Sequence, residues 1–182
     1  MERASPPSPK DPHHGSHSTR FYLTTPLHDS SGSPQEPNGS FWHPKANATA
    51  YCTLANAVGA ALKASYPGEI YVGPTTSGFD IPFITTVFQC GTLKYFDAVS
   101  VHPYRGSNPE TVLPDYATLR SLIEQYAPTP ARQALPILSG EWGYTTCTQP
   151  CNGQDVSLQT QAQYLARQWL TNDLAGVPVS IW

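Results

Sequence analysis

Residues 96–104 of the chain, FDAVSVHPY, combine a short apolar run with polar side chains at its end. The run shows little alternation, which is typical of a strand buried on both faces of a parallel sheet. His102 and Tyr104 follow where this strand is expected to end. In α/β folds, binding and catalytic side chains gather at the carboxyl ends of parallel strands. The stretch therefore predicts an α/β fold with a functional site at one edge of its sheet.

Similar apolar runs recur along the chain, and the spacing between them is that of strand–helix units. Strands are expected to begin near residues 69, 96, 135 and 177, the first of them being Ile70–Val72, closed by Gly73 and Pro74. Apolar residues at helical spacing predict helices that end before Pro67 and that cover about 80–91, 116–126 and 158–174. In the last helix, one apolar side is expected to face the core, formed by Leu158, Ala162, Leu165, Trp169 and Leu170.

This alternation fits either a doubly wound sheet or part of a (β/α)8 barrel. A doubly wound fold usually binds a nucleotide through a glycine-rich first turn, and the sequence contains neither G-x-G-x-x-G nor a Walker motif. The chain has 182 residues, whereas a complete barrel typically needs about 250. We therefore predict a partial, truncated barrel.

The amino-terminal part differs from the rest in composition. Residues 1–34 are rich in proline, serine and histidine without sustained periodicity, so we expect an irregular or disordered segment there and one domain over 35–182. The histidines at 13, 14 and 17 suit either a metal ion or, as we prefer, a low-complexity tail. The net charge of −3 and the lack of a long apolar run argue against nucleic-acid and membrane partners.

Two glutamates stand at candidate strand ends. Glu36 precedes the first predicted helix, and Glu141 follows the strand that ends near Leu138. Their separation of 105 residues corresponds to about three barrel units of roughly 31 residues each. Glycoside hydrolysis needs two carboxylates across one pocket. Trp142 and Trp182 offer flat faces on which sugar rings pack.

At these residues the chain resembles glycoside hydrolase clan A, in particular family 5 cellulase-like and family 39 xylosidase-like enzymes. Residues 35–38, QEPN, resemble the acid/base motif at the end of that clan's fourth strand. Residues 101–104 and 138–143 resemble the ends of its sixth and seventh strands, and residues 180–182 resemble its eighth. The resemblance covers about residues 35–182 and implies a barrel fragment from about strand 4 or 5 to strand 8.

The resemblance also implies roles for individual residues. Glu36 would be the acid/base and Glu141 the nucleophile of a retaining hydrolase of β-linked glycosides or polysaccharides, without a metal or other cofactor. Substrate-binding positions would be Gln35, His102, Tyr104, Trp142 and Trp182. The clan has asparagine where this chain has Gln35, so the contact to the sugar 2-hydroxyl is altered, and the strand expected before it is replaced by a polar stretch.

Two alternatives of other classes remain open. A catalytically inactive half-barrel would bind carbohydrate or a partner through the same aromatic residues. A metal-dependent barrel enzyme would use Glu36, His102 and Glu141 as ligands, although a full ligand set is hard to assemble. Neither the sugar nor the oligomeric state is predicted by the sequence.

The cysteines bear on the cellular compartment. Cys147 and Cys151 lie in a polar loop where a local disulfide is expected, whereas Cys52 and Cys90 lie on predicted helices as buried thiols. Asn38 and Asn47 each begin a glycosylation sequon. These features favour secretion, although no signal peptide is evident at the amino terminus.

Overall fold

The computed structural model describes residues 21–23, 36–147 and 155–182. Five parallel strands form one sheet in chain order: β1 (Phe21–Leu23), β2 (Ile70–Ser77), β3 (Ala98–His102), β4 (Ile137–Ser139) and β5 (Val179–Ser180). The main helices between them are α1 (Ala48–Ser65), α2 (Ile81–Gln89), α3 (Leu113–Tyr126) and α5 (Leu158–Leu174). Shorter helical turns are η1 (Thr92–Lys94), η2 (Pro109–Val112) and α4 (Pro130–Gln133).

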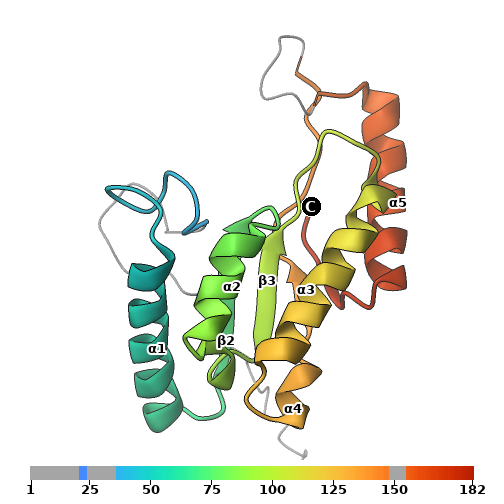
Figure 1. Ribbon diagram of the computed structural model, residues 1–182. Helices are drawn as coiled ribbons and strands as arrows, with labels where there is room; N and C mark the ends of the chain where they lie inside the picture. The colour runs from blue at the N-terminus through green and yellow to red at the C-terminus, as the bar shows by residue number, and fades with distance from the viewer. Residues whose placement is uncertain (1–20, 24–35, 148–154) are drawn as a thin grey trace, which may run out of the picture.

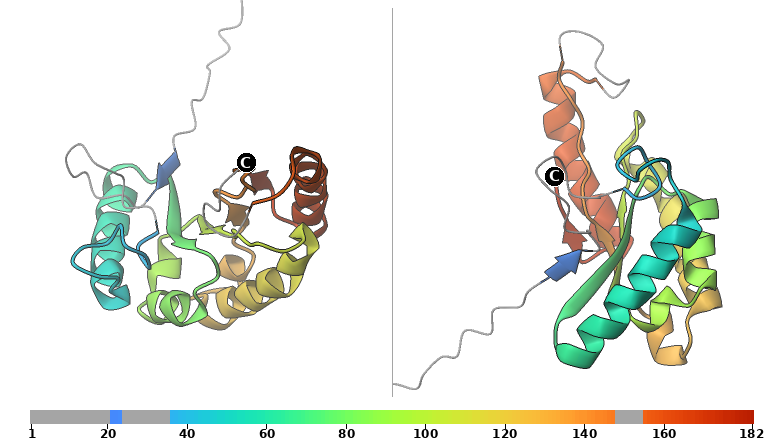
Figure 2. Two further views of the ribbon diagram at one scale, coloured as in Figure 1. Left: turned by 90° about the horizontal axis from the view of Figure 1, so that it is seen from above. Right: turned by 90° about the vertical axis from the view of Figure 1, so that its left-hand side faces the viewer.

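The helices follow one another along the outer side of an arc, and the strands lie on its inner side (Figure 1; Figure 2, left). Each pair of neighbouring strands is parallel and is connected through a helix on the same outer side. This arrangement is that of a partial (β/α)8 barrel, as predicted. Within the described residues, no helix is long and apolar enough to cross a membrane.

Two strands differ from the predicted ones. Strand β1, Phe21–Leu23, lies within the segment expected to be irregular, and it pairs with the first three residues of β2. Strand β2 does not stop at Gly73 and Pro74 but continues to Ser77, with a shift of register between Pro74 and Thr76. Glycine is required at position 73, because a Cβ atom there would lie 2.7 Å from the ring of Phe96.

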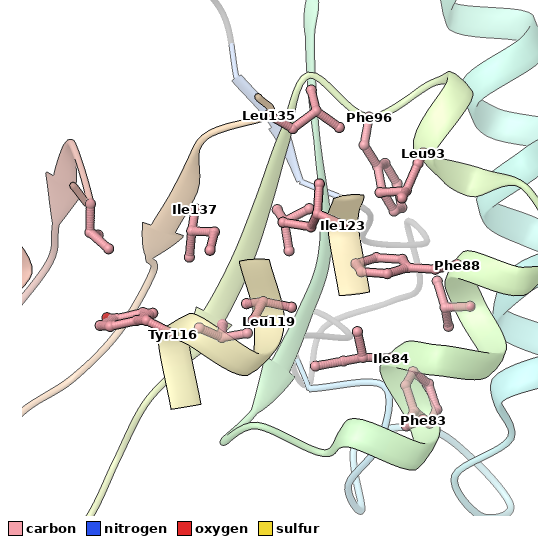
Figure 3. Packing of buried hydrophobic residues seen from close by; sticks show 14 of the residues in the cluster. Phe83, Ile84, Phe88, Leu93, Phe96, Tyr116, Leu119, Ile123, Leu135 and Ile137 are labelled. Atoms are coloured by element: carbon pink, nitrogen blue, oxygen red, sulfur yellow. The ribbon is translucent and has the colours of Figure 1, made fainter. Parts of the chain in front are cut away.

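The main core lies between the sheet and α1, α2 and α3. Phe88, Leu119 and Ile123 are almost completely buried there and point toward strands β2 and β3 (Figure 3). Helix α2 begins at the predicted cap Asp80, whose Oδ1 accepts a hydrogen bond from the amide of Phe83. Capping and apolar packing together fix the helix against the strands that carry the site.

The predicted orientation of the last helix is wrong. Helix α5 has the expected bounds, but it buries polar residues, namely Gln168, Thr171 and Asn172. The apolar residues expected to face the core are exposed instead, among them Leu158, Leu165, Trp169 and Leu170. The buried amides meet polar partners: Gln168 donates to the carbonyl of Trp142, and Asn172 donates to the Ser180 hydroxyl. An apolar face in the same place would leave such groups unpaired.

The prediction of free thiols in the helices is also wrong. Cys52 of α1 and Cys90, which caps the end of α2, form a disulfide. Asn56 lies beside it and donates a hydrogen bond to the carbonyl of Cys90. Cys147 is disulfide-bonded as well, whereas its expected partner Cys151 lies outside the described residues. The helical Cys pair was missed because its partners are 38 residues apart and meet only through tertiary packing.

Candidate active site

The carboxyl end of strand β3 forms the centre of the candidate site. His102 is the last residue of β3, and its side chain is almost completely buried. Its carbonyl accepts hydrogen bonds from the amides of Gly78 and Tyr104, which fix the chain on both sides of the strand end. Gly140 lies beside the imidazole, where a Cβ atom would come 3.3 Å from the ring and collide with Ser100. Glycine at position 140 therefore permits the close approach of β3 and the β4 end.

Glu36 lies at the start of a short turn and faces His102. Its Oε1 is 3.0 Å from Nδ1 of His102, and 18% of its side chain is exposed. The amide of Glu36 donates to the carbonyl of Thr75, and both residues have a φ of 58°. Residues with a side chain rarely adopt this left-handed conformation, so the backbone here is held by its surroundings.

Glu141 approaches the same imidazole from the end of β4. Its Oε2 lies 3.7 Å from Nδ1 of His102, and its Oε1 accepts a hydrogen bond of 2.6 Å from the Tyr104 hydroxyl. Burial first, and then the hydrogen bond to Glu141 and the charges of both glutamates, raise the pKa of Tyr104. The hydroxyl therefore stays protonated and donates to Glu141, which it orients. The side chain of Glu141 is 45% exposed and accessible to a substrate.

The shared imidazole limits the distance between the two carboxylates. The two contacts to Nδ1 place the nearest oxygens of Glu36 and Glu141 at most about 6.7 Å apart, the sum of 3.0 and 3.7 Å. Retaining glycosidases hold their carboxyl groups about 5–5.5 Å apart and inverting ones about 6.5–9.5 Å. This limit on one pair of oxygens is compatible with the separation of the carboxyl groups in a retaining enzyme.

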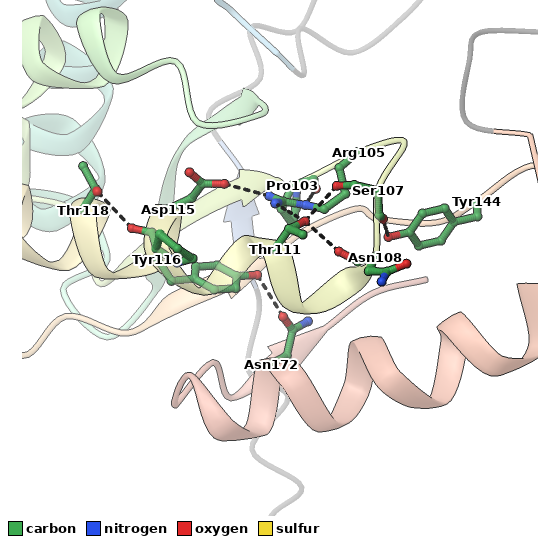
Figure 4. Close-up of polar contacts among 11 residues, drawn as sticks. Pro103, Arg105, Ser107, Asn108, Thr111, Asp115, Tyr116, Thr118, Tyr144 and Asn172 are labelled. Atoms are coloured by element: carbon green, nitrogen blue, oxygen red, sulfur yellow. Dashed lines mark hydrogen bonds and ion pairs between the residues drawn. The ribbon is translucent and has the colours of Figure 1, made fainter. Parts of the chain in front are cut away.

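The loop that follows β3 is fixed by side chains from two directions (Figure 4). Arg105 donates to the carbonyl of Pro103 and to Asp115 of α3. The hydroxyl of Tyr144 donates to the carbonyl of Ser107. The loop that carries Tyr104 is therefore hydrogen-bonded both to α3 and to the segment after β4, which fixes its position.

The predicted aromatic platforms have different environments. Trp142 is completely buried, with the Arg105 guanidinium 5.6 Å from its ring centre, so burial does not support a sugar-stacking role. Trp182 is 41% exposed and packs beside Tyr144, with a centroid distance of 6.2 Å. It also lies over Gly143, two residues after Glu141. Gln35 lies outside the described residues.

The structure gives a role to one residue that the sequence analysis named only as part of a motif and of a sequon. Asn38 had been noted for its sequon, but its side chain forms hydrogen bonds with Ser77 and Asp80. In the sequence, Asn38 is recognisable only as an amide two residues after Glu36. So short a pattern does not identify Ser77 and Asp80, which lie about 40 residues away, as its partners. Among the described residues, no group of three or more His, Cys, Asp or Glu side chains is arranged to hold a metal ion.

Comparison with known proteins relates this geometry to solved structures. No family model matches the chain, and no curated protein matches it. A family 39 β-xylosidase from Caulobacter crescentus matches with 27% identity and a TM-score of 0.58, covering 81% of this chain and 31% of the xylosidase. An α-L-arabinofuranosidase from Thermotoga maritima matches with 18% identity and a TM-score of 0.60, covering 80% of this chain and 32% of that enzyme.

The fold is clan A glycosidase-like. The solved structures that match include family 39 and family 51 enzymes. The predicted resemblance to clan A is therefore supported at the level of the fold, and the chain is assigned to neither family. The predicted fold, an α/β arrangement that matches part of a (β/α)8 barrel, is confirmed. This glycosidase-like chain spans about a third of the length of the solved structures that it matches.

Proposed function

We propose that the chain carries the two catalytic carboxylates of a retaining glycosidase acting on β-linked glycosides or polysaccharides. The observation that carries this proposal is the pair of contacts from His102 Nδ1 to Glu36 and Glu141. The likeness to a β-xylosidase and an α-L-arabinofuranosidase supports an O-glycosyl substrate. Trp182, partly exposed and lying over Gly143 two residues after Glu141, supplies an apolar surface for a sugar ring.

In the proposed first step, Glu141 attacks the anomeric carbon while Glu36 transfers its proton to the departing glycosidic oxygen. In the second step, Glu36 takes a proton from water, and that water releases the sugar from Glu141. The Tyr104 hydroxyl donates to Glu141 and orients its carboxylate for the attack in the first step. His102 forms a hydrogen bond with Glu36 and lies 3.7 Å from Glu141, so it positions Glu36 near the second carboxyl group.

The test is turnover of nitrophenyl β-xyloside, β-glucoside, β-mannoside and α-L-arabinofuranoside. We expect Glu141→Gln to abolish turnover and Glu36→Gln to lower it by about 10²–10⁴-fold. Glu124→Gln is the matched control, because Glu124 is exposed on α3 and far from the site in the fold. Equal activity of the Glu141→Gln variant and the wild type would refute the assignment.

One observation favours a second candidate, a carbohydrate-binding module without activity. Within the described residues, β1 and β5 each pair on one side only, so the barrel is open beside the site. Affinity gels containing xylan or cellulose distinguish the two functions. Retention on a gel, without turnover of any of the four glycosides, would support the binding module.

A further inference from the structure

The turn that carries Glu36 has few backbone contacts with the sheet. The amide of Gly39 donates to the carbonyl of Glu36 and closes the turn. Within the described residues, the backbone bond from Glu36 to Thr75 is the one that joins the 36–41 segment to β2. A general acid must stay within hydrogen-bond reach of the leaving oxygen, so a loosely held turn would not suffice.

Asn38 supplies the missing attachment through its side chain. Its Nδ2 donates to the carbonyl of Ser77 at 2.9 Å, and its Oδ1 accepts from the amide of Ser77 at 2.8 Å. Ser77 is the last residue of β2. One amide thus satisfies both main-chain groups at the strand end, as a neighbouring strand would.

The same amide reaches the helix that follows. Asn38 Nδ2 lies 3.2 Å from Oδ2 of Asp80, while Oδ1 of Asp80 caps α2. The turn is thereby attached to the end of β2 and to the capped start of α2, whose buried face packs in the main core. A glycan on Asn38 would replace a hydrogen of the donating amide and would remove one of these hydrogen bonds. The sequon at this position therefore conflicts with the structural role of the side chain.

Strand β2 is shaped to receive this turn. The register shift between Pro74 and Thr76 leaves Thr75 with a φ of 58° and its carbonyl facing the amide of Glu36. A β-branched residue is unfavourable in this conformation, and such residues persist where the surroundings hold them. The Asn38 contacts lie two residues further along β2 and hold the same irregular segment.

We infer that Asn38 is a positioning residue, which sets the location of the Glu36 carboxyl without touching it. The inference rests on the proposed function, because it assigns Asn38 to the acid/base step. Loss of Asn38 should therefore slow the step that needs a proton at the leaving oxygen. Glycosides whose leaving group departs without a proton should be much less affected.

The experiment compares Asn38→Ala and Asn38→Asp with Asn47→Ala. Asp keeps the acceptor for Ser77 but loses the donor and places a carboxylate opposite Asp80. Asn47→Ala is the control, since Asn47 also begins a sequon but caps α1 through a bond to Ala50. The readouts are kcat/KM on phenyl and 2,4-dinitrophenyl glycosides of one sugar and hydrogen exchange of the Glu36, Gly39 and Ser77 amides.

For Asn38→Ala we expect kcat/KM on the phenyl glycoside to fall about tenfold or more, with the dinitrophenyl glycoside changing less than about threefold. Exchange of the three amides should become faster, which Asn47→Ala should not cause. Equal losses on both glycosides, or unchanged exchange, would overturn the role of Asn38. If the wild type hydrolyses neither glycoside, the proposed glycosidase function fails, and the exchange rates alone decide whether Asn38 fixes the turn.

Discussion

The two sides of the arc are built differently. On the side of α1, α2 and α3, aromatic and aliphatic residues pack against β2 and β3 (Figure 3). A disulfide also joins α1 to the end of α2. On the side of α5, the residues that the helix itself buries are polar, and its Trp169 is 56% exposed. Glu36 depends on the first side through β2, whereas Glu141 extends from the second side at the end of β4. The site therefore joins a densely packed half to one held by hydrogen bonds.

This difference shows what determines the buried face of a helix. Helix α2 meets apolar side chains and buries its own. Helix α5 meets the carbonyl of Trp142 and the hydroxyls of Tyr116 and Ser180, and its buried face matches them with amides. Because leaving such groups unpaired is costly, the partners that a helix meets outweigh its apolar periodicity.

The largest expected contrast is between Phe88 and Trp169. Phe88→Ala should lower the free energy of unfolding by about 3–5 kcal/mol, since it leaves a cavity in the main core. Trp169→Ala should change it by less than about 0.5 kcal/mol, because the ring is largely exposed. Urea unfolding followed by circular dichroism measures both. Similar losses for the two variants would mean that the α5 face is covered in solution.

The disulfide on the packed side should rank next. Replacing Cys52 and Cys90 together by alanine should cost about 2–4 kcal/mol, because the crosslink restricts the unfolded chain. Cys147→Ala with Cys151→Ala is the matched comparison, and its expected short loop predicts a smaller loss. Unfolding midpoints in urea decide the order. A larger loss of stability on replacing Cys147 and Cys151 would show that the Cys52–Cys90 disulfide is not the more stabilising of the two.

The hydrogen bonds of α5 should contribute less than either. Asn172→Ala removes the partners of the Tyr116 and Ser180 hydroxyls and should cost about 1–3 kcal/mol. The adjacent Asp173 is exposed, so Asp173→Ala should stay within about 0.5 kcal/mol. The same urea titration applies. An Asn172→Ala variant as stable as the wild type would show that α5 is not held by its buried amides.

The smallest expected effect concerns the ion pair that joins the two sides. Hydrogen bonds from Arg167 of α5 hold the pKa of Glu110 in η2 below its ordinary value. A carboxyl with a lowered folded pKa contributes stability above its unfolded pKa and loses it as the pH falls through the folded value. The wild type should therefore exceed Glu110→Gln slightly in urea midpoint at about pH 7, and the difference should vanish at strongly acidic pH. A difference that persists in acid would contradict this account.

Local patterns in the sequence predicted the elements but not their long-range partners. The apolar run before His102 and the helical spacing over residues 158–174 gave the correct types and order. Neither the pairing of Cys52 with Cys90 nor the polar face of α5 follows from such patterns, because each depends on residues distant in the chain. The extension of β2 past Pro74 was missed for a related reason, since proline is tolerated there only beside a register shift.

The candidate site shows the same limit. Glu36 and Glu141 were predicted from their positions near strand ends, and the structure brings both to His102. Asn38 acts through Ser77 and Asp80, which no short motif specifies. Trp142 is completely buried, with Arg105 over its ring, and its position beside a glutamate in the sequence does not reveal this burial.

The central claim is that Glu36 and Glu141 work as acid/base and nucleophile in one site. The most direct measurement is mass spectrometry of peptides after incubation with 2,4-dinitrophenyl 2-deoxy-2-fluoro-β-xyloside and the matching glucoside, which slow release of a covalent glycosyl-enzyme. We expect one fluorosugar on Glu141 and none in the Glu141→Gln variant. An adduct on another residue, or turnover of the parent glycosides without any adduct, would contradict it.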